Sequence, residues 1–313
     1  MKTLDLIGIG ECMVEFHADR PLGETSTLHR SYGGDVLNTL VMGSRLGLKT
    51  SFISRVGNDP FGTGLLQAWQ KEGVDTQHVP LVDGENGMYF ISLLPGGERE
   101  FTYRRAGSAA SQLRCEHLDA EHLASARMLL VSGITQAISE SAQQTVLEAV
   151  KQAKAAGVQV VYDPNFRPRL WAIRGGQQRG KEAFFEVLPF VDVLLPSAPA
   201  DLVMLELDHL PIQEALLVLS KLHPCVVLKS GEDGAYFAQQ GHPGHVAADQ
   251  AQQVLDTTGA GDCWNGAFLQ QVLLGVSLPE AIWFAHQVAA RKLAYRGAIP
   301  PKDFMSNIAP RKI

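Results

Sequence analysis

Apolar and polar positions alternate in a regular way beyond about residue 110 of this 313-residue chain. Helical periodicity predicts helices at 139–157, between a capping Ser139 and a terminating Gly157, and near 211–222. Strands that alternate with helices predict right-handed crossovers and an α/β fold, with a mostly parallel central sheet covered by helices on both faces. The short apolar runs that we expect to form buried strands are 4–10, 128–133, 158–163, 191–197 and 225–231.

Residues 87–107 interrupt this pattern with two extended stretches on either side of "PGGE" (95–98), which predicts a β-hairpin. Because side chains alternate along a strand, Phe101, Tyr103 and Arg105 share one face. That face is either ordinary surface or closes over a polar ligand. We expect a single domain, 1–313, with a small β lid built from about 11–32 and 87–107.

A glycine turn near the C-terminus leads directly into a predicted helix. In "VLDTTGAGDCWNGAFLQQVLLG" (254–275) the large apolar residues from Trp264 onward recur three or four apart, which predicts one buried helix face and an end at Gly275. Asp262 then lies in or beside the first turn. Unpaired N–H groups and the helix dipole attract anions there, although aspartate is also a common cap, so both interpretations stand.

A second glycine turn opens "YGGDVLNTLVMGSRLG" (32–47), an amphipathic helix pattern that ends near Gly47. Asp35 and Asn38 are three apart and therefore neighbours on one helix face. They either cap a solvated helix start, or they hydrogen-bond a ligand hydroxyl that approaches the backbone at Gly33 and Gly34.

Composition narrows the class of protein. A net charge of −6 argues against nucleic acid or an acidic membrane as a partner, and no apolar run approaches the ~18 residues of a membrane span. Four distant cysteines form no CxxC pair, which favours a reducing cytoplasm. "GIGECM" lacks the third glycine of a dinucleotide fingerprint, so a Rossmann site is rejected. His242 and His245, in "GHPGH", are expected in a solvated loop.

These segments together resemble the ribokinase/PfkB family of carbohydrate kinases over essentially the whole chain. The resemblance rests on Gly33-Gly34 with Asn38, the following "GLKTSFISRVGNDPFG", and the late "DTTGAGD". Within the family, the chain most resembles the members that act on 2-keto-3-deoxygluconate. This narrower resemblance rests on "GECMVEF", "YGGDVLNT", "FTYRRAGSAA", "LVSGIT", "NFRPRLW" and "AYRGAIPP". The resemblance implies a ribokinase-like fold and ATP-dependent phosphorylation of this sugar acid at its terminal hydroxyl.

The resemblance also implies roles for the late glycine turn. Asp262 would be the catalytic base, and the N–H groups of Gly259, Ala260 and Gly261 would form the anion hole. Phosphoryl transfer depends on positioning and charge stabilisation, so this division of roles is chemically reasonable. Since the chain has no GxxxxGK[ST] loop, this turn must bind the transferred phosphate.

On the substrate side, the resemblance implies a group of residues that would surround the sugar acid. Arginine suits a carboxylate because its planar fork can donate two hydrogen bonds to it. A salt bridge beside the sheet is the alternative role for Arg167, and the one we expect for Arg169. The implied substrate-binding residues are Gly34, Asp35, Asn38, Tyr89, Tyr103, Arg105, Ile134 and Arg167.

For the nucleotide, the resemblance implies Asn165, Ser197, Lys229, Gly231 and Gly234, together with Gly261 of the turn. Lys229 could instead be a surface residue at a strand end. ATP and Mg2+ are the expected cofactors, but the Asn-x-x-Glu motif of relatives is replaced by "SAPA" (197–200) with Asp201 next. Either Asp201 substitutes, or magnesium is held mostly by phosphates and water.

The resemblance further suggests a monovalent cation such as K+ at Asp256 and Thr258, with the backbone around 295–297. It implies a cytoplasmic enzyme whose partners are ATP and a small sugar acid, and an exposed hairpin edge favours a homo-oligomer. Two alternatives remain at this point: another sugar kinase of the family, fructokinase-like, or a non-catalytic sugar-acid sensor. Sequence does not decide between the gluconate and galactonate epimers of the substrate.

Overall fold

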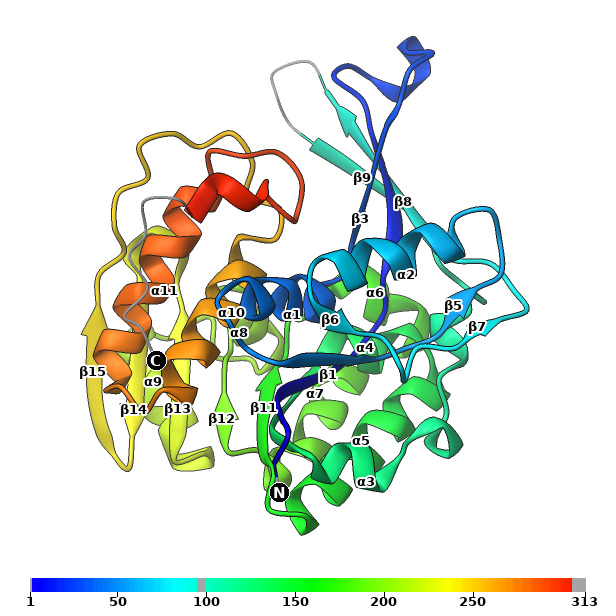
Figure 1. The fold of residues 1–313 in the computed structure, drawn as a ribbon. Coiled ribbons are helices and arrows are strands. Elements are labelled where there is room, and N and C mark those ends of the chain that lie inside the picture. The colour runs from blue at the N-terminus through cyan, green and yellow to red at the C-terminus, as the bar shows by residue number, and fades with distance from the viewer. Residues whose placement is uncertain (1, 95–98, 306–313) are drawn as a thin grey trace.

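The structure is a computed structural model that describes residues 2–94 and 99–305. Across these residues a nine-stranded sheet has the order β15-β14-β13-β12-β11-β10-β1-β4-β6 (Figure 1). Every pairing from β12–β13 to β4–β6 is parallel, while β14 and β15 add an antiparallel edge. The strands are β1 (Leu4–Ile9), β4 (Thr50–Ile53), β6 (Val74–Asp75), β10 (Ala126–Ser132), β11 (Gln159–Asp163), β12 (Val193–Leu194), β13 (Cys225–Lys229), β14 (Ala235–Gln239) and β15 (His242–Val246).

Helices cover both faces of this sheet, as the alternating pattern predicted (Figure 1). One apolar core lies between the sheet and a group that includes α1, α2, α10 and α11, and a second core lies against a group that includes α5, α7 and α9. The helices are α1 (Asp35–Arg45), α2 (Gly62–Lys71), α3 (Ala120–Ala124), α4 (Gly133–Ile138), α5 (Glu140–Ala155), α6 (Pro168–Trp171), α7 (Gly176–Val187), α8 (Ala200–Met204), α9 (Ile212–Leu222), α10 (Ala260–Leu273) and α11 (Leu278–Lys292).

The residues predicted to begin and end helices do so in the structure. The Ser139 hydroxyl oxygen accepts a 3.0 Å hydrogen bond from Ala142 N–H at the start of α5, and Gly157 follows its end with φ of 65°. Gly275 has φ of 75° just beyond α10. A residue without Cβ adopts this left-handed conformation at little cost, which is why glycine ends these helices.

A second sheet of four strands projects from the main body, in the order β3-β2-β8-β9 (Figure 1). Its strands are β2 (Met13–His17), β3 (His29–Gly33), β8 (Gly87–Leu93) and β9 (Arg99–Arg104). The predicted hairpin is present as the antiparallel pair β8–β9, with Tyr89 opposite Tyr103, while its "PGGE" turn lies outside the described residues. Met13, Tyr89, Ile91 and Phe101 form a small apolar cluster in this sheet, whereas Val14, Phe16, Tyr32 and Met88 pack with the first core of the main body. A two-stranded sheet, β5 (Val56–Gly57) and β7 (Leu81–Val82), lies apart from it.

Two expectations about local environment were wrong. The apolar spacing of α10 predicted one buried face, but nearly every residue from Cys263 to Leu273 is buried, because α10 contacts both α1 and α11. His242 and His245 of "GHPGH" lie in the edge strand β15 and not in a loop, although both are exposed to solvent as expected. His245 stacks on Tyr236 with ring centroids 4.3 Å apart and hydrogen-bonds the Asp233 carbonyl.

The parallel strands β1, β10 and β11 end on the same side of the sheet, where α1 and α10 begin. In open parallel sheets ligands bind outside the carboxyl ends of the strands. This edge is therefore the place to look for a functional site. Among the described helices, none combines the length and apolar character that crossing a membrane requires.

Candidate functional site

Two helices begin at this edge, and a glycine precedes each of them. Gly34 caps α1, and a Cβ there would lie 2.0 Å from the Glu11 carbonyl oxygen. Gly259 caps α10 with φ of 72°, and a Cβ there would lie 2.6 Å from the Ala298 carbonyl oxygen. No other residue fits either position without displacing backbone, so the glycines allow the two helix starts to pack closely.

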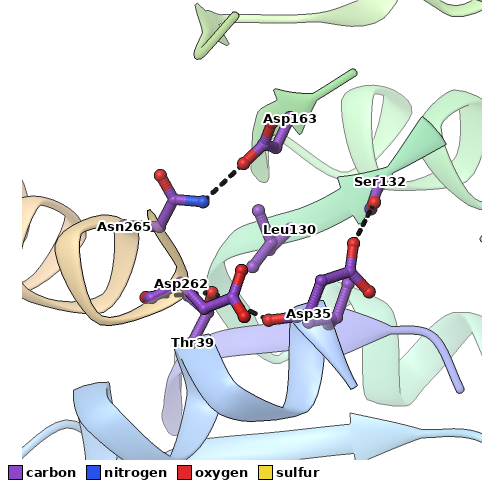
Figure 2. Close-up of a pocket in the computed structure, with 8 residues that line it drawn as sticks. Asp35, Thr39, Leu130, Ser132, Asp163, Asp262 and Asn265 are labelled. Carbon is purple, nitrogen blue, oxygen red and sulfur yellow. Dashed lines mark hydrogen bonds between the residues drawn. The ribbon is translucent and has the colours of Figure 1, made fainter. Parts of the chain in front are cut away.

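A pocket opens between these helix starts. Figure 2 shows Asp35 of α1, Asp163 of β11 and Asp262 of α10 around it, and the other residues that line it are Val36, Thr39, Leu130, Ser132 and Asn265. Asp262 lies in the first turn of α10, as predicted. Its Oδ2 accepts a 2.8 Å hydrogen bond from Asn38 Nδ2, and its carbonyl accepts one from the Thr39 hydroxyl at 3.2 Å.

The electrostatics of the pocket favour proton exchange at Asp262. Burial raises the pKa of this carboxyl to about 7, and the neighbouring Asp35 carboxylate acts in the same direction. The hydrogen bond from Asn38 opposes the shift because it favours the ionised form. A carboxyl with a pKa near neutrality is suited to act as a general base.

Asp35 does not cap a solvated helix start, which was one of the two interpretations of the sequence. Its Oδ2 accepts hydrogen bonds from the Ser132 hydroxyl and, at 3.2 Å, from Asn165 Nδ2. Its Oδ1 is buried and has no hydrogen-bond partner among the described residues. Burial raises the pKa of Asp35. Asn165, which was expected to bind the nucleotide, thus contacts Asp35, which was expected to bind the sugar.

Lys229 is buried, which excludes the surface position considered from sequence. Its Nζ donates to Asp163 Oδ2 at 2.8 Å and to Asn265 Oδ1 at 3.0 Å, and Asn265 Nδ2 donates to the same Asp163 oxygen at 2.6 Å. Sequence reasoning missed Asp163 and Asn265. The available signals were a carboxylate at the end of a buried strand and a polar residue within the apolar stretch of α10.

Asp201 is fully buried, and its carboxylate is already occupied. It accepts the N–H groups of Phe166 at 2.7 Å and of Ser197 at 2.6 Å, one on each oxygen. Asp201 therefore holds two loops at the sheet edge together. Asp163 Oδ1, by contrast, is a buried oxygen at the pocket that has no partner among the described residues.

Two buried glutamates, which the sequence did not single out, contact the predicted substrate residues of the second sheet. Arg105 is ion-paired with Glu11, and its guanidinium lies 4.8 Å from the centre of the Tyr103 ring. Tyr89 donates its hydroxyl to Glu15. Tyr103 is 45 % exposed and stacks beside Tyr89, with ring centroids 5.9 Å apart. As the alternation predicted, Tyr103 and Arg105 share one face of the hairpin.

Arg167 precedes α6 and is exposed. Its guanidinium bonds only the Phe166 carbonyl, at 3.2 Å, and it forms no salt bridge with any residue that the structure describes. Its charge nevertheless lowers the pKa values of both Asp35 and Asp262, so it lies near the pocket. Ile134 lies in the first turn of α4 at the same sheet edge, where its N–H donates to the Ser132 hydroxyl at 3.1 Å.

Of the predicted anion-hole amides, one is already used. Ala260 N–H donates to the Thr257 carbonyl at 3.1 Å, whereas the N–H groups of Gly259 and Gly261 have no acceptor in the described part of the chain. The N–H group of Asp262, which was not predicted, has no acceptor there either. Beyond β13, Gly231 and Gly234 lie in a short turn with φ of 55° and 93°. Ser197 pairs with Lys229 in an isolated bridge, which places these nucleotide candidates at neighbouring strand ends.

The expected monovalent-cation residues are close together but already bonded. Asp256 Oδ1 accepts Thr258 N–H at 2.8 Å and is ion-paired with Arg99, while its Oδ2 accepts Gly297 N–H at 2.7 Å. The buried ammonium of Lys292 donates to the Asp256 carbonyl at 2.8 Å and to that of Tyr295 at 3.2 Å. The oxygens here do not fit an added cation.

Comparison with known proteins places this arrangement among sugar kinases. The family model described as "pfkB family carbohydrate kinase" matches residues 3–304. A 2-dehydro-3-deoxygluconokinase from Dickeya dadantii is 33 % identical, over 97 % of this chain and 99 % of that protein. One from Escherichia coli K12 is 31 % identical, over 95 % and 97 %.

Solved structures agree with this placement. A PfkB protein from Polaromonas sp. JS666 superposes with a TM-score of 0.86 at 30 % identity, covering 98 % of this chain and all of that one. An E. coli protein assigned as a ribokinase II, in complex with ATP and Mg2+, superposes with a TM-score of 0.85 at 26 % identity, covering 95 % and 94 %. The predicted ribokinase-like fold is confirmed.

Proposed function

Because the chain belongs to the PfkB family of carbohydrate kinases, we propose that it transfers the γ-phosphoryl group of ATP to the terminal hydroxyl of 2-keto-3-deoxygluconate. The product is 2-keto-3-deoxy-6-phosphogluconate. The single observation that carries the proposal is Asp262, a carboxylate with a pKa of about 7 at a helix N-terminus in a pocket at the sheet edge. The names of the relatives support this sugar acid as the substrate.

Asp262 is the base in this scheme. As the sugar oxygen forms its bond to the γ-phosphorus, its proton passes to a carboxylate oxygen of Asp262, and the bond between that phosphorus and the departing ADP oxygen breaks. Asn38 holds the carboxylate from the first turn of α1. A base positioned in this way typically contributes about 10²–10⁴-fold to the rate.

The free amides of Gly261 and Asp262, at the positive end of α10, stabilise the charge that develops on the transferred group. Lys229 adds a positive charge at the same edge, held by Asp163 and Asn265. Mg2+ would neutralise charge on the ATP phosphates, and the unpaired Asp163 Oδ1 suits one of its bound waters. Most of its ligands would then come from phosphates and water.

Arg167 and Arg105 recognise the carboxylate of the sugar acid. The Arg167 guanidinium has no salt-bridge partner among the described residues, so it is available to a ligand. Arg105 is paired with Glu11, and its guanidinium lies 4.8 Å from the centre of the Tyr103 ring. Asp35 and Asn38 bind the sugar hydroxyls, with Gly34 allowing close approach of the backbone.

A coupled assay of ADP release tests this function with 2-keto-3-deoxygluconate, its galactonate epimer, fructose and ribose as substrates. We expect the highest kcat/KM for the keto acids and a phosphate monoester on C6, identified by NMR. A higher kcat/KM for fructose would favour the fructokinase-like alternative. Absence of turnover with every compound would favour a sensor.

We further infer a cytoplasmic enzyme that associates through its second sheet. The four cysteines are all free, which suits a reducing compartment. The strands β3 and β9 form the two edges of the second sheet, and such edges can pair with another subunit. Light scattering of the purified chain would test the association, with a monomer at every concentration as the contrary result.

A further inference from the structure

Lys292, the last residue of α11, is a charged residue with 0 % of its surface exposed. An ammonium is buried only where other groups compensate for lost hydration. Here the compensation comes from the carbonyl oxygens of Asp256 and Tyr295, at 2.8 and 3.2 Å. Burial lowers the pKa of Lys292, and the nearby Asp256 carboxylate opposes this shift.

These contacts join two segments that frame the anion-binding turn. Asp256 lies near the end of the loop between β15 and α10, and Tyr295 lies in the loop that follows α11. The Asp256 carboxylate fastens the same two loops, because its oxygens accept N–H groups from both Thr258 and Gly297. Gly259 then packs on Ala298, so the position of the turn depends on how these loops are held.

A K+ ion at this place would need several of these oxygens, since protein carbonyls bind it by replacing its hydration shell. Two of the carbonyls already accept the Lys292 ammonium, and both carboxylate oxygens of Asp256 are bonded. Glu15, the other carboxylate of the adjoining pocket, accepts the Tyr89 hydroxyl at Oε2, while its Oε1 lies 3.3 Å from His17 Nδ1 without a hydrogen bond to any described residue.

Charge also opposes an added cation. The Asp256 carboxylate has Arg99 on one side and Lys292 nearby, so two permanent or nearly permanent positive charges already surround it. A third positive charge within a few ångströms would be repelled by both. The family expectation of a monovalent cation at Asp256 and Thr258 therefore disagrees with the groups that this chain places there.

We propose that the Lys292 ammonium replaces the monovalent cation, so that the chain holds its anion-binding turn with a built-in positive charge and requires no K+. The ammonium carries the charge of K+ and donates to carbonyl oxygens where K+ would be coordinated. The activity readout of this inference rests on the proposed kinase function. The unfolding temperature does not depend on that function, so it tests the role of Lys292 even if the proposed kinase function is wrong.

The first experiment uses the unmodified chain. Its kcat/KM and its unfolding temperature are measured at equal ionic strength with K+, Na+ or tetramethylammonium as the only monovalent cation. We expect the same values in all three salts. Activation or thermal stabilisation specific to K+ would overturn the proposal, because a bound ligand stabilises the folded state by mass action.

The second experiment removes the ammonium. Lys292→Ala leaves room for an ion, whereas Lys292→Met removes the charge but fills the space. In tetramethylammonium we expect both variants to lose at least about tenfold in kcat/KM, the loss of a buried charge partner. K+ should restore activity and raise the unfolding temperature of Lys292→Ala, but not of Lys292→Met.

Full activity of Lys292→Ala without K+ would contradict the proposal. Equal recovery of Lys292→Ala and Lys292→Met when K+ is added would contradict it too. If Lys292→Ala folds only when K+ is present, the proposal is supported. If it folds in no salt, the comparison of salts on the unmodified chain decides alone. If the chain phosphorylates no sugar acid, the proposed function fails, and the unfolding temperatures still test the role of Lys292.

Discussion

Asn38 Nδ2 donates a 2.8 Å hydrogen bond to Asp262 Oδ2 across 224 positions of sequence. The bond joins the first turns of α1 and α10, so one side chain fixes both the direction of the carboxylate and its affinity for a proton. It favours the ionised form of Asp262, whereas burial and the Asp35 carboxylate favour the protonated form. Asn38 is thus a positioning residue for the proposed base.

Asp262→Asn should lower kcat by about 10²–10⁴-fold, because the amide cannot accept the hydroxyl proton. Size and helix position are retained, so the fold should survive. Binding of ATP and of 2-keto-3-deoxygluconate, measured by calorimetry, should change little. A near-normal kcat would mean that Asp262 serves only the helix terminus.

The acid limb of the pH profile should report the raised pKa of Asp262. Only the ionised carboxylate accepts a proton, so kcat/KM should rise with pH through about 7 and then level off. Asp35→Asn removes a carboxylate that raises this pKa and should move the limb to lower pH. Asn38→Ala removes a hydrogen bond that lowers it and should move the limb to higher pH.

Stopped assays over a range of pH, at substrate concentrations well below KM, provide these profiles. The two variants serve as controls for each other, since a general structural defect would lower activity without shifting the limb in opposite directions. Shifts of the same sign in both variants would assign the limb to another group.

The elements of the fold could be predicted because their signals are local. Ser139 and Gly157 lie next to the helix that they delimit, and strand-length apolar runs need no knowledge of distant residues. Pairings such as Arg105 with Glu11 could not be predicted, since they depend on how β9 is placed against the segment between β1 and β2. The same holds for Lys292, whose partners lie in loops that only the folded chain brings together.

The sequence pattern also did not predict how completely α10 is buried. In α10 the large apolar residues mark one face correctly, but Asn265 and Gln270 are buried as well. Their side chains find polar partners inside the protein: Asn265 bonds Asp163, and Gln270 accepts from Gln271. A polar residue in an apolar helix is therefore consistent with a fully buried helix when another element, as for Asn265, or a neighbour in the same helix, as for Gln270, supplies its hydrogen bond.

Hydrogen exchange in β8 and β9 should slow when the sugar acid is added, because the second sheet projects from the main body, β9 is one of its edges, and Tyr103 on β9 is 45 % exposed. Closure over the substrate would protect its backbone amides. The measurement compares the free chain, the chain with ATP alone and the chain with the keto acid. Unchanged exchange at saturating keto acid would indicate a rigid element, such as an oligomer contact.

The arginines differ in a way that makes their roles separable. Arg167 has no salt-bridge partner within the described residues, so Arg167→Ala should reduce kcat/KM for the keto acid without loss of stability. Loss of one partner of a charge pair in a partly closed site costs about 2–5 kcal/mol, and the loss should be much smaller with fructose. Arg169→Ala, also exposed and two positions away, is the control and should change little.

Arg105→Ala should reduce activity on the keto acid and also destabilise the fold, because it leaves the buried Glu11 without its ion-pair partner. Removal of one member of a buried pair costs about 3–5 kcal/mol of unfolding free energy. Adding Glu11→Gln to Arg105→Ala should restore most of that stability, measured by denaturant unfolding, but not the preference for the keto acid over fructose. If stability and preference return together, Arg105 serves only to neutralise Glu11. If Arg105→Ala and Arg167→Ala lower activity equally on acid and neutral sugars, the two arginines do not bind the substrate carboxylate, and the fructokinase-like alternative is favoured.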